Sequence, residues 1–229
     1  MGDFKAVIFD LDGTLYKSKF LPLLCVLKFP KDALRMRAER LARRGVKGFE
    51  WDSVTSMEAD FAQRISRLSG GSAGAVSQWR SRKFPQIQAD VLKNHCSARE
   101  GAKELILGLS GAGIKIAVLS DYGFAGGKME AIGLGGKVLD AMAGVFSAQD
   151  FACLKPSARA FLKVAEKMQV LPSECLVVGD RDDTDGEGAR KSGMSFILIT
   201  DSNKKRADGK SPVMKWRDFL DWAGKNLVL

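Results

Sequence analysis

Short runs of apolar residues recur along this chain, and each run ends at a polar residue. Runs of this length that are rich in β-branched residues are typical of strands buried in a parallel sheet. The polar residue that follows would then stand at the strand's carboxyl end. The runs cover residues 5–9, 114–119, 175–179 and 195–199, and they end at or near Asp10, Ser120, Asp180 and Asp201.

Amphipathic helical patterns separate these runs, for example over residues 98–109 and 161–168. Strands that alternate with helices predict a parallel sheet in a three-layer α/β/α, Rossmann-like fold. In such open sheets a ligand binds beyond the carboxyl ends of the strands. We therefore expect Asp10, Asp12, Ser120 and Asp180 to converge at one edge of the sheet.

Residues 17–95 interrupt the alternation, because they show helical rather than strand periodicity. We interpret them as an inserted α-helical cap domain, and residues 1–16 and 96–229 as the α/β catalytic core. Hinges are expected near residues 16–20 and 93–98. The cap would then open and close over the site.

One cap helix is predicted over residues 52–68, with Asp52 as its N-terminal cap. Its apolar positions recur at helical spacing, which favours packing in a core over a binding surface. The stripe consists of Val54, Met57, Phe61, Ile65 and Leu68.

A second cap helix is predicted over residues 32–44, and one side of it is rich in arginine. This side could be a solvated helix face, a patch that meets a phosphate-bearing substrate, or a nucleic-acid contact, and we rank the interpretations in that order. The arginines are Arg35, Arg37, Arg40, Arg43 and Arg44.

The 229 residues are 45% hydrophobic, which is ordinary for a packed globular protein and argues against disorder. With 36 basic and 27 acidic residues the formal net charge is +9, which favours an anionic substrate or partner. The four tryptophans are dispersed and no nucleic-acid-binding motif is present, so nucleic acid is not the favoured partner.

The remaining compositional signals concern metals, membranes and location. The four cysteines are scattered singly, which does not favour structural zinc or disulfides. The apolar stretch 20–27 contains Pro22 and stops at Lys28, far short of the roughly 20 residues of a membrane helix. Residues 1–6 lack the basic and apolar regions of a signal peptide, so we expect a cytoplasmic protein with no membrane span.

Asp10 and Asp12 leave the first predicted strand on the same side, and Gly13 permits a tight turn after them. Carboxylates this close repel one another unless a hard cation such as Mg²⁺ lies among them. A second acidic cluster, residues 180–185, follows a later strand and could complete the oxygen shell, with Asp180 as the best ligand. Asp182 and Asp183 are more typical of a solvated loop.

Ser120 could hydrogen-bond a phosphate oxygen, and Lys155 could neutralise charge on a nucleophile and on a transferring phosphoryl group. Taken singly, Lys155 is as typical of a surface lysine and Ser120 of a helix cap. Their place in an ordered set of motifs is what makes them candidates.

Together these four segments resemble the haloacid dehalogenase-like (HAD) hydrolase superfamily, of the phosphatase type with a helical cap. The resemblance implies that Asp10 attacks phosphorus and becomes an aspartyl-phosphate. Asp12 would protonate the leaving alcohol, activate water afterwards, and bind Mg²⁺ through its backbone carbonyl. Asp10, Asp180 and Asp185 would supply the other protein ligands of the metal.

Carried over by position, Thr14 closes the first motif, Ser120 is the phosphate-holding hydroxyl, and Lys155 is the lysine of the third motif. Dehalogenases of this superfamily lack the second aspartate of the first motif, so Asp12 favours phosphoryl transfer. Two departures affect substrate placement: Asp121 stands where many relatives have a neutral residue, and Gly186-Glu187-Gly188 replaces an apolar position.

The sequence therefore predicts a Mg²⁺-dependent phosphatase for a small phosphorylated metabolite, such as a sugar phosphate, phosphoglycolate or a nucleotide. A phosphomutase of the β-phosphoglucomutase type, and a non-enzymatic protein that binds phospho-ligands, stay open as alternatives. The oligomeric state is not predicted.

Overall fold

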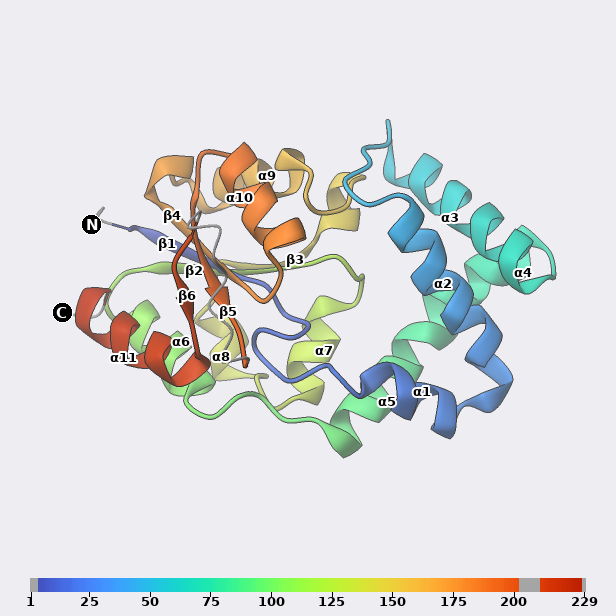
Figure 1. Cartoon of the computed structure of the whole chain (residues 1–229), viewed down its shortest axis with the longest axis horizontal. Coiled ribbons are helices and arrows are strands. Elements are labelled where there is room, and N and C mark those ends of the chain that lie inside the picture. Colours follow the sequence, from blue (N-terminus) through green and yellow to red (C-terminus); the bar gives the residue numbers. More distant parts are fainter. Residues whose placement is uncertain (1–3, 202–210, 228–229) are drawn as a thin grey trace.

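The computed structural model describes residues 4–201 and 211–227, and its centre is a parallel sheet. The six strands lie in the order β3-β2-β1-β4-β5-β6 (Figure 1). This arrangement confirms the predicted fold class. The strands are β1 (Ala6–Phe9), β2 (Lys115–Ser120), β3 (Gly144–Ser147), β4 (Cys175–Gly179), β5 (Ser195–Ile199) and β6 (Val213–Met214).

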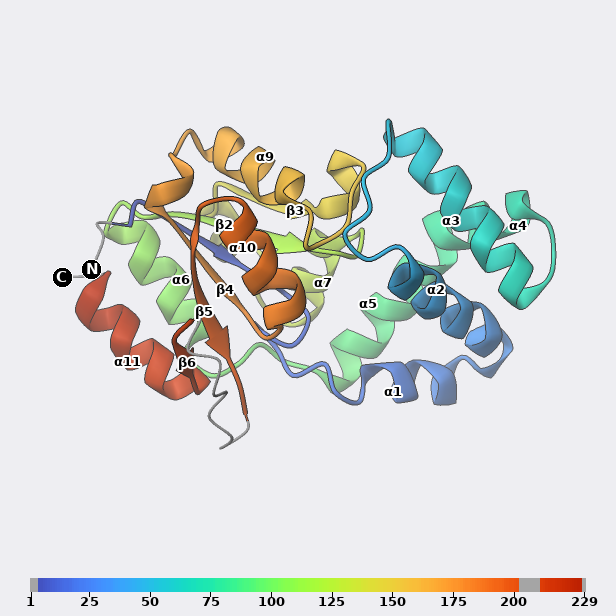
Figure 2. The ribbon, with the colours of Figure 1, turned by 45° about the horizontal axis from the view of Figure 1, so that its top comes forward.

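Helices cover both faces of the sheet, because alternate residues of each central strand bury apolar side chains on opposite sides. Val7 and Phe9 of β1 pack in a cluster with α6, α7, α8 and α11, whereas Ala6 and Ile8 pack with α9 and α10 (Figure 2). The helices are α6 (Ala102–Gly111), α7 (Ala125–Ala131), α8 (Lys137–Asp140), α9 (Ala158–Met168), α10 (Glu187–Lys191) and α11 (Trp216–Asn226).

The register of the central strands brings their carboxyl ends to one level. Phe9 of β1 pairs with Val118 of β2 on one side and with Val178 of β4 on the other. The residues that follow these strands therefore emerge at the same edge of the sheet. This edge faces the segment between β1 and β2 that contains the cap helices (Figure 1).

The inserted segment is helical, as the sequence predicts. Its elements lie beside the sheet and not over either of its faces (Figures 1 and 2). The exact limits of the cap, residues 17 and 95, stay a prediction. The helices are α1 (Leu21–Lys28), α2 (Ala33–Gly45), α3 (Val54–Ser69), α4 (Ala73–Gln78) and α5 (Phe84–His95), and a π-helical turn, Trp79–Lys83, joins α4 to α5.

A separate hydrophobic cluster is formed mainly by α2 and α3 of the cap, and Ala152 and Leu154 of the core belong to it as well. Met57, Phe61 and Ile65 of α3 are fully buried in it, whereas Val54 and Leu68 are exposed, so the predicted stripe is narrower than expected. The predicted cap residue Asp52 is wrong by one position. Ser53 begins the helix instead, since its hydroxyl accepts the Ser56 N–H at 3.1 Å and satisfies a free donor of the first turn.

The two chain segments that connect cap and core lie side by side, where Tyr16 and Ala98 form an antiparallel bridge. The loop between α2 and α3 makes a third contact with the core. There the Trp51 N–H donates to the Ala152 carbonyl at 2.8 Å, and the Leu154 N–H donates to the Phe49 carbonyl at 3.1 Å. In the described part of the chain, no helix has both the length and the apolar character needed to cross a membrane.

Candidate active site

Asp10 follows β1 directly and lies at the bottom of the site, with 9% of its surface exposed. One carboxylate oxygen is 2.8 Å from the Lys155 ammonium nitrogen, and the other accepts the Thr14 hydroxyl at 3.0 Å. Lys155 also lies 2.8 Å from an oxygen of Asp185. Two of the three predicted substrate-binding residues, Thr14 and Lys155, therefore contact the predicted nucleophile, whereas the third, Ser120, contacts Asp12.

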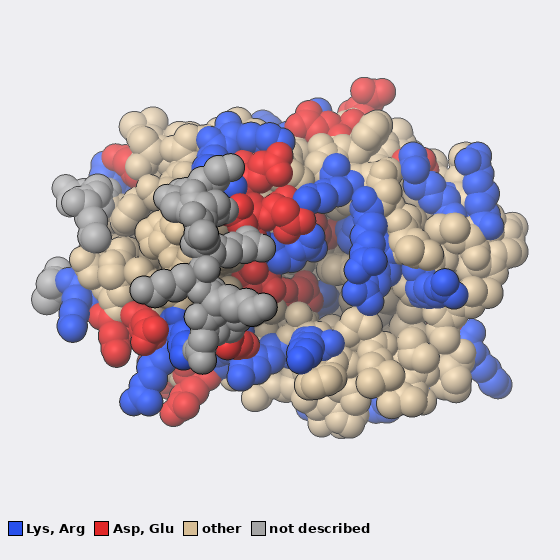
Figure 3. Space-filling view, in the orientation of Figure 1, with Lys and Arg blue, Asp and Glu red and all other residues tan. Residues whose placement is uncertain are grey.

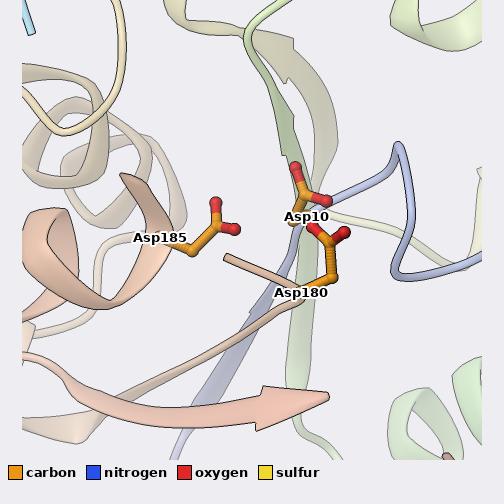
Figure 4. Close-up of side chains that lie close together, drawn as sticks. All are labelled: Asp10, Asp180 and Asp185. Carbon is orange, nitrogen blue, oxygen red and sulfur yellow. The ribbon is translucent and has the colours of Figure 1, made fainter. Parts of the chain in front are cut away.

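Three carboxylates face a common space beside Lys155 (Figure 4). One oxygen each from Asp10, Asp180 and Asp185 lies within 4.8 Å of the others. Asp180 follows β4, and Asp185 belongs to a π-helical turn, Asp182–Gly186, that leads into α10. The Asp12 carboxylate lies outside this group. That Asp12 binds the metal through its backbone carbonyl stays a prediction.

Gly13 makes room for this arrangement. Its φ of +107° is in the region that favours glycine, and a Cβ atom there would lie only 2.2 Å from an Asp180 oxygen. Arg99 holds the same turn, because its guanidinium donates to the Gly13 carbonyl at 2.9 Å and pairs with Asp201. Arg99 thus holds the turn that follows Asp12 in place.

The three carboxylates together have more negative charge than the single ammonium group of Lys155 balances. Burial, followed by the nearby charges of Asp185 and Asp12, raises the pKa of Asp10 to about 7 against the opposing effect of Lys155. Burial together with Asp10 and Asp185 raises the pKa of Asp180 to about 8. A divalent cation with oxygen ligands would relieve this repulsion, so the residues present fit Mg²⁺.

Asp12 has a different environment from Asp10. Its two oxygens lie 2.7 and 3.0 Å from the ammonium nitrogen of Lys128, and it also accepts hydrogen bonds from the hydroxyls of Tyr16 and Ser120. Although burial raises the pKa of Asp12, these interactions outweigh it and the net pKa is lowered. Asp12 is therefore ionised, and Ser120 is bonded to it at 3.1 Å.

The sequence reasoning missed Lys128 and Tyr16, although both contact Asp12. Lys128 is fully buried in α7, three residues after Ala125 and next to Met129, which are buried with it. A lysine within the apolar face of a helix is rare unless it is paired. The place of Lys128 among apolar residues of the helix was therefore the sequence feature that could have identified it as a paired, buried lysine.

Asp121, noted above as a departure from the family pattern, supports the Lys155 segment. One of its carboxylate oxygens accepts the backbone N–H of Lys155 at 2.8 Å. Its carbonyl accepts hydrogen bonds at 2.7 Å from Arg43 of the cap and from Gln149 of the core. Burial raises the pKa of Asp121 despite the opposing charges of Lys155 and Arg43. Asp121 thus connects the cap to the lysine that contacts the nucleophile.

Asp182 and Asp183 are ion-paired away from the three carboxylates. Asp182 lies 2.9 Å from Arg190, and Asp183 pairs with Arg181 at 2.7 Å and with Lys47 of the cap at 2.6 Å. These pairs lower the pKa of Asp183 to about 2. Both acids are accordingly poor candidates for a shared metal site.

The Gly186-Glu187-Gly188 departure has a packing explanation. A Cβ atom on Gly188 would lie 2.1 Å from the Phe161 ring of α9, so the absence of a side chain allows α10 to approach α9 closely. Gly186 and Gly188 are buried, whereas Glu187 pairs with Lys191 at the surface. Its composition is explained without reference to the substrate.

A cavity of about 220 Å³ lies between these core residues and the C-terminal half of α2. In Figure 3, Lys and Arg side chains of the cap face Asp and Glu side chains of the core near the middle of the molecule. The core lines the cavity with Asp10, Asp12, Asp121, Tyr122, Leu154, Lys155, Asp180, Arg181, Thr184 and Asp185, and the cap lines it with Arg40, Arg43, Arg44 and Lys47.

This combination of fold and site matches a known family. The family model described as haloacid dehalogenase-like hydrolase matches residues 4–193. The chain belongs to this family. The match spans the core and the cap together, so this HAD-like hydrolase has both domains within one family model.

Solved structures share the fold at low sequence identity. A predicted phosphoglycolate phosphatase from Haemophilus somnus is 20% identical, with a TM-score of 0.63 over 97% of this chain and 99% of that one. CbbY from Rhodobacter sphaeroides, solved with phosphate, is 19% identical, with a TM-score of 0.68 over 99% and 100%. A 2-haloacid dehalogenase from Pseudomonas syringae pv. Tomato is 16% identical, with a TM-score of 0.65 over 92% and 94%. A comparison with curated proteins found no match.

Proposed function

We propose that this HAD-like hydrolase is a Mg²⁺-dependent phosphatase that hydrolyses a small phosphate monoester through an aspartyl-phosphate on Asp10. Solved structures with this fold include enzymes named as phosphatases and as dehalogenases, so the fold alone does not choose the reaction. The choice depends on the residues around Asp10.

The observation that carries the proposal is the pair of carboxylates with different environments, Asp10 and Asp12. Asp10 lies among other acids with a raised pKa, whereas Asp12 lies against Lys128 with a lowered pKa. Two carboxylates whose environments separate their pKa values are a common basis for dividing catalytic roles. Without a metal Asp10 has the higher pKa, and a divalent cation bound to Asp10 would favour the ionised form that a nucleophile needs. A displacement of halide by Asp10 would not need the second carboxylate.

Asp10, Asp180 and Asp185 would hold the Mg²⁺, with the Asp12 carbonyl as a further oxygen ligand. When bound, the metal offsets negative charge on the phosphate and on the attacking carboxylate. Lys155 acts beside Asp10, since its ammonium group contacts both Asp10 and Asp185. The Lys155 ammonium group can therefore orient Asp10 while it offsets charge on the phosphoryl group.

In the first half of the reaction an Asp10 oxygen forms a bond to phosphorus, the bond from phosphorus to the leaving oxygen breaks, and Asp12 gives a proton to that oxygen. In the second half, Asp12 accepts a proton from water as the water oxygen attacks phosphorus and frees Asp10. Lys128 favours the ionised form of Asp12, which is the form that the second half requires. The first half requires the protonated form, so a proton must reach Asp12 against the effect of Lys128 before the leaving oxygen departs.

The test is turnover of p-nitrophenyl phosphate by the full chain in Mg²⁺, in a chelator, and after Mg²⁺ is restored. We expect release of inorganic phosphate that the chelator abolishes and Mg²⁺ restores. A 2-haloacid serves as the competing substrate. Halide release without phosphate release would contradict the proposal, and transfer of the phosphoryl group to a second hydroxyl would favour a phosphomutase.

A further inference from the structure

The wall of the cavity opposite Asp10 is strongly basic. Arg40, Arg43 and Arg44 of α2, with Lys47 just beyond the helix, line it from the cap side. Residues four apart on a helix are neighbours on one face, so Arg40 and Arg44 project from the same side of α2. The cap therefore presents a group of cations to whatever binds over the carboxylates.

Two of these four cations already have anionic partners. Arg43 lies 2.5 Å from Glu39 and donates to the Asp121 carbonyl, and Lys47 lies 2.6 Å from Asp183. Arg40 and Arg44 are exposed and have no ion pair or hydrogen bond with any residue that the structure describes. Of these four cations, Arg40 and Arg44 are thus the two without a charged partner among the described residues.

Unpaired arginines on a surface are usually just solvated, and cations near the C-terminal end of a helix interact favourably with its dipole. Neither explanation accounts for their position in the wall of the catalytic cavity. Like charges four residues apart also repel each other, which disfavours this pair in the absence of an anion. The arrangement is better explained by an anionic group that both arginines bind.

The transferred phosphate is not this group. Under the proposed function it lies at Asp10, where Lys155 and a Mg²⁺ held by the three carboxylates would offset its charge. Arg40 and Arg44 line the cavity from the opposite domain, so under the proposed function they would face the leaving group of the ester. The cavity, at about 220 Å³, is smaller than the roughly 300–1,000 Å³ of sites for drug-sized ligands, which favours a small leaving group.

We infer that the substrate is a small phosphate monoester whose leaving group bears a second anionic group, a carboxylate or a second phosphate, that binds Arg40 and Arg44. Guanidinium groups suit both ligands, because their planar N–H pairs match two oxygens of a carboxylate or a phosphate. This inference rests on the proposed phosphatase function. It adds a substrate class and two specificity residues to it.

The experiment compares matched esters that differ in the second charge. kcat/KM is measured in Mg²⁺ for phosphoglycolate against 2-hydroxyethyl phosphate, and for 1,3-propanediol bisphosphate against 3-hydroxypropyl phosphate. We expect the wild type to prefer at least one of the doubly charged esters by about tenfold or more, as expected for charge-assisted hydrogen bonds. The pair that shows the preference distinguishes a carboxylate from a second phosphate.

The variants Arg40→Gln and Arg44→Gln test the assignment of residues. Each is expected to lower the charged-to-uncharged ratio of kcat/KM about tenfold, mainly through KM, because each removes one charge-assisted contact. The matched control is Arg37→Gln, an exposed arginine of the same helix outside the cavity wall, about 4.5 Å along the axis from Arg40 and about 10 Å from Arg44. This control is expected to leave the ratio unchanged.

The outcomes separate this inference from the proposed function. If no phosphate ester is hydrolysed, the proposed function is wrong. If esters are hydrolysed with no preference for a second charge, or if Arg37→Gln lowers the ratio as much as Arg44→Gln, the phosphatase assignment stands and the role of Arg40 and Arg44 is contradicted.

Discussion

The two walls of the catalytic cavity differ in how their charges are satisfied. On the core side, Asp10, Asp12 and Lys155 are buried or nearly so and have specific partners at 2.7–3.1 Å. On the cap side, Arg40 and Arg44 are exposed and have no partner among the described residues. A fixed reaction requires a preorganised set of contacts, whereas the residues that meet a substrate stay available until it binds. The core wall thus fits the chemistry and the cap wall fits the choice of substrate.

The largest effect is expected from Asp10→Asn on the core wall. We expect kcat for p-nitrophenyl phosphate to fall by about four orders of magnitude or more, because the nucleophile is removed. The thermal midpoint should be unchanged or higher, since the substitution also removes a charge from a repulsive group of acids. Asp183→Asn, an exposed acid outside that group, is the control and should retain most activity. Equal losses in the two variants would contradict the assignment of Asp10.

The next effect concerns Asp12, where the account predicts a loss of both activity and stability. Asp12→Asn leaves the Lys128 ammonium group without its carboxylate. We expect a destabilisation of about 2 kcal/mol, below the roughly 3–5 kcal/mol of a fully buried pair, because the Asp12 side chain is 20% exposed. Chemical denaturation measures this change.

The double variant Asp12→Asn/Lys128→Met is the control for that prediction. It removes both charges, so it should recover most of the lost stability and none of the lost turnover. If the double variant is less stable than Asp12→Asn, the ion pair is not the cause of the destabilisation.

A smaller effect is expected from pH on the metal-free protein. The folded-state pKa values of Asp10 and Asp180, about 7 and about 8, lie above the roughly 4 of an unfolded aspartate. The folded state therefore binds more protons than the unfolded state at pH 5 to 8, and its stability falls as pH rises through this range. Denaturation at pH 5, 6, 7 and 8 in a chelator measures this slope.

Mg²⁺ should reverse that slope, since it binds the ionised carboxylates and only the folded state assembles them. The stabilisation by Mg²⁺ is expected to be greater at pH 8 than at pH 5. Asp180→Asn should reduce both the pH slope and the Mg²⁺ effect. A metal-free slope of the opposite sign would contradict the account of the core wall.

The smallest effect is expected where cap and core meet at the surface. Lys47 and Asp183 pair across the domains but are both exposed, so Lys47→Gln should change the free energy of unfolding by less than about 1 kcal/mol. Denaturation in low and high salt checks this value. A larger loss would mean that this pair, and not the backbone contacts of residues 49–51 with 152–154, holds the cap in place.

The fold could be predicted well from the sequence because apolar runs and helical stripes reflect burial directly. The order of strand-end residues likewise indicated that Asp10, Ser120 and Asp180 lie near one another. Lys128 could not be placed in the same way, since its partner Asp12 is 116 positions away and only the packing of α7 against the sheet edge brings the two together. The same limit applied to Asp121.

The cap was harder to predict than the core for a related reason. Its arginines were ranked first as a solvated face, because periodicity places residues on a helix but does not orient that helix toward another domain. The loop from Gly48 to Trp51, which pairs with residues 152–155, sets that orientation through backbone contacts that leave no side-chain pattern. Only the three-dimensional structure therefore showed that Arg40 and Arg44 line the catalytic cavity.

The central claim is that Asp10 becomes phosphorylated during turnover. The most direct measurement is an acid quench of the full chain during hydrolysis of a phosphate ester in Mg²⁺, followed by peptide mapping with mass spectrometry. The account predicts a phosphorylated peptide that contains Asp10 and is absent from Asp10→Asn. Turnover by the wild type with no phosphate on Asp10 at any quench time, or with the phosphate on another residue, would contradict it.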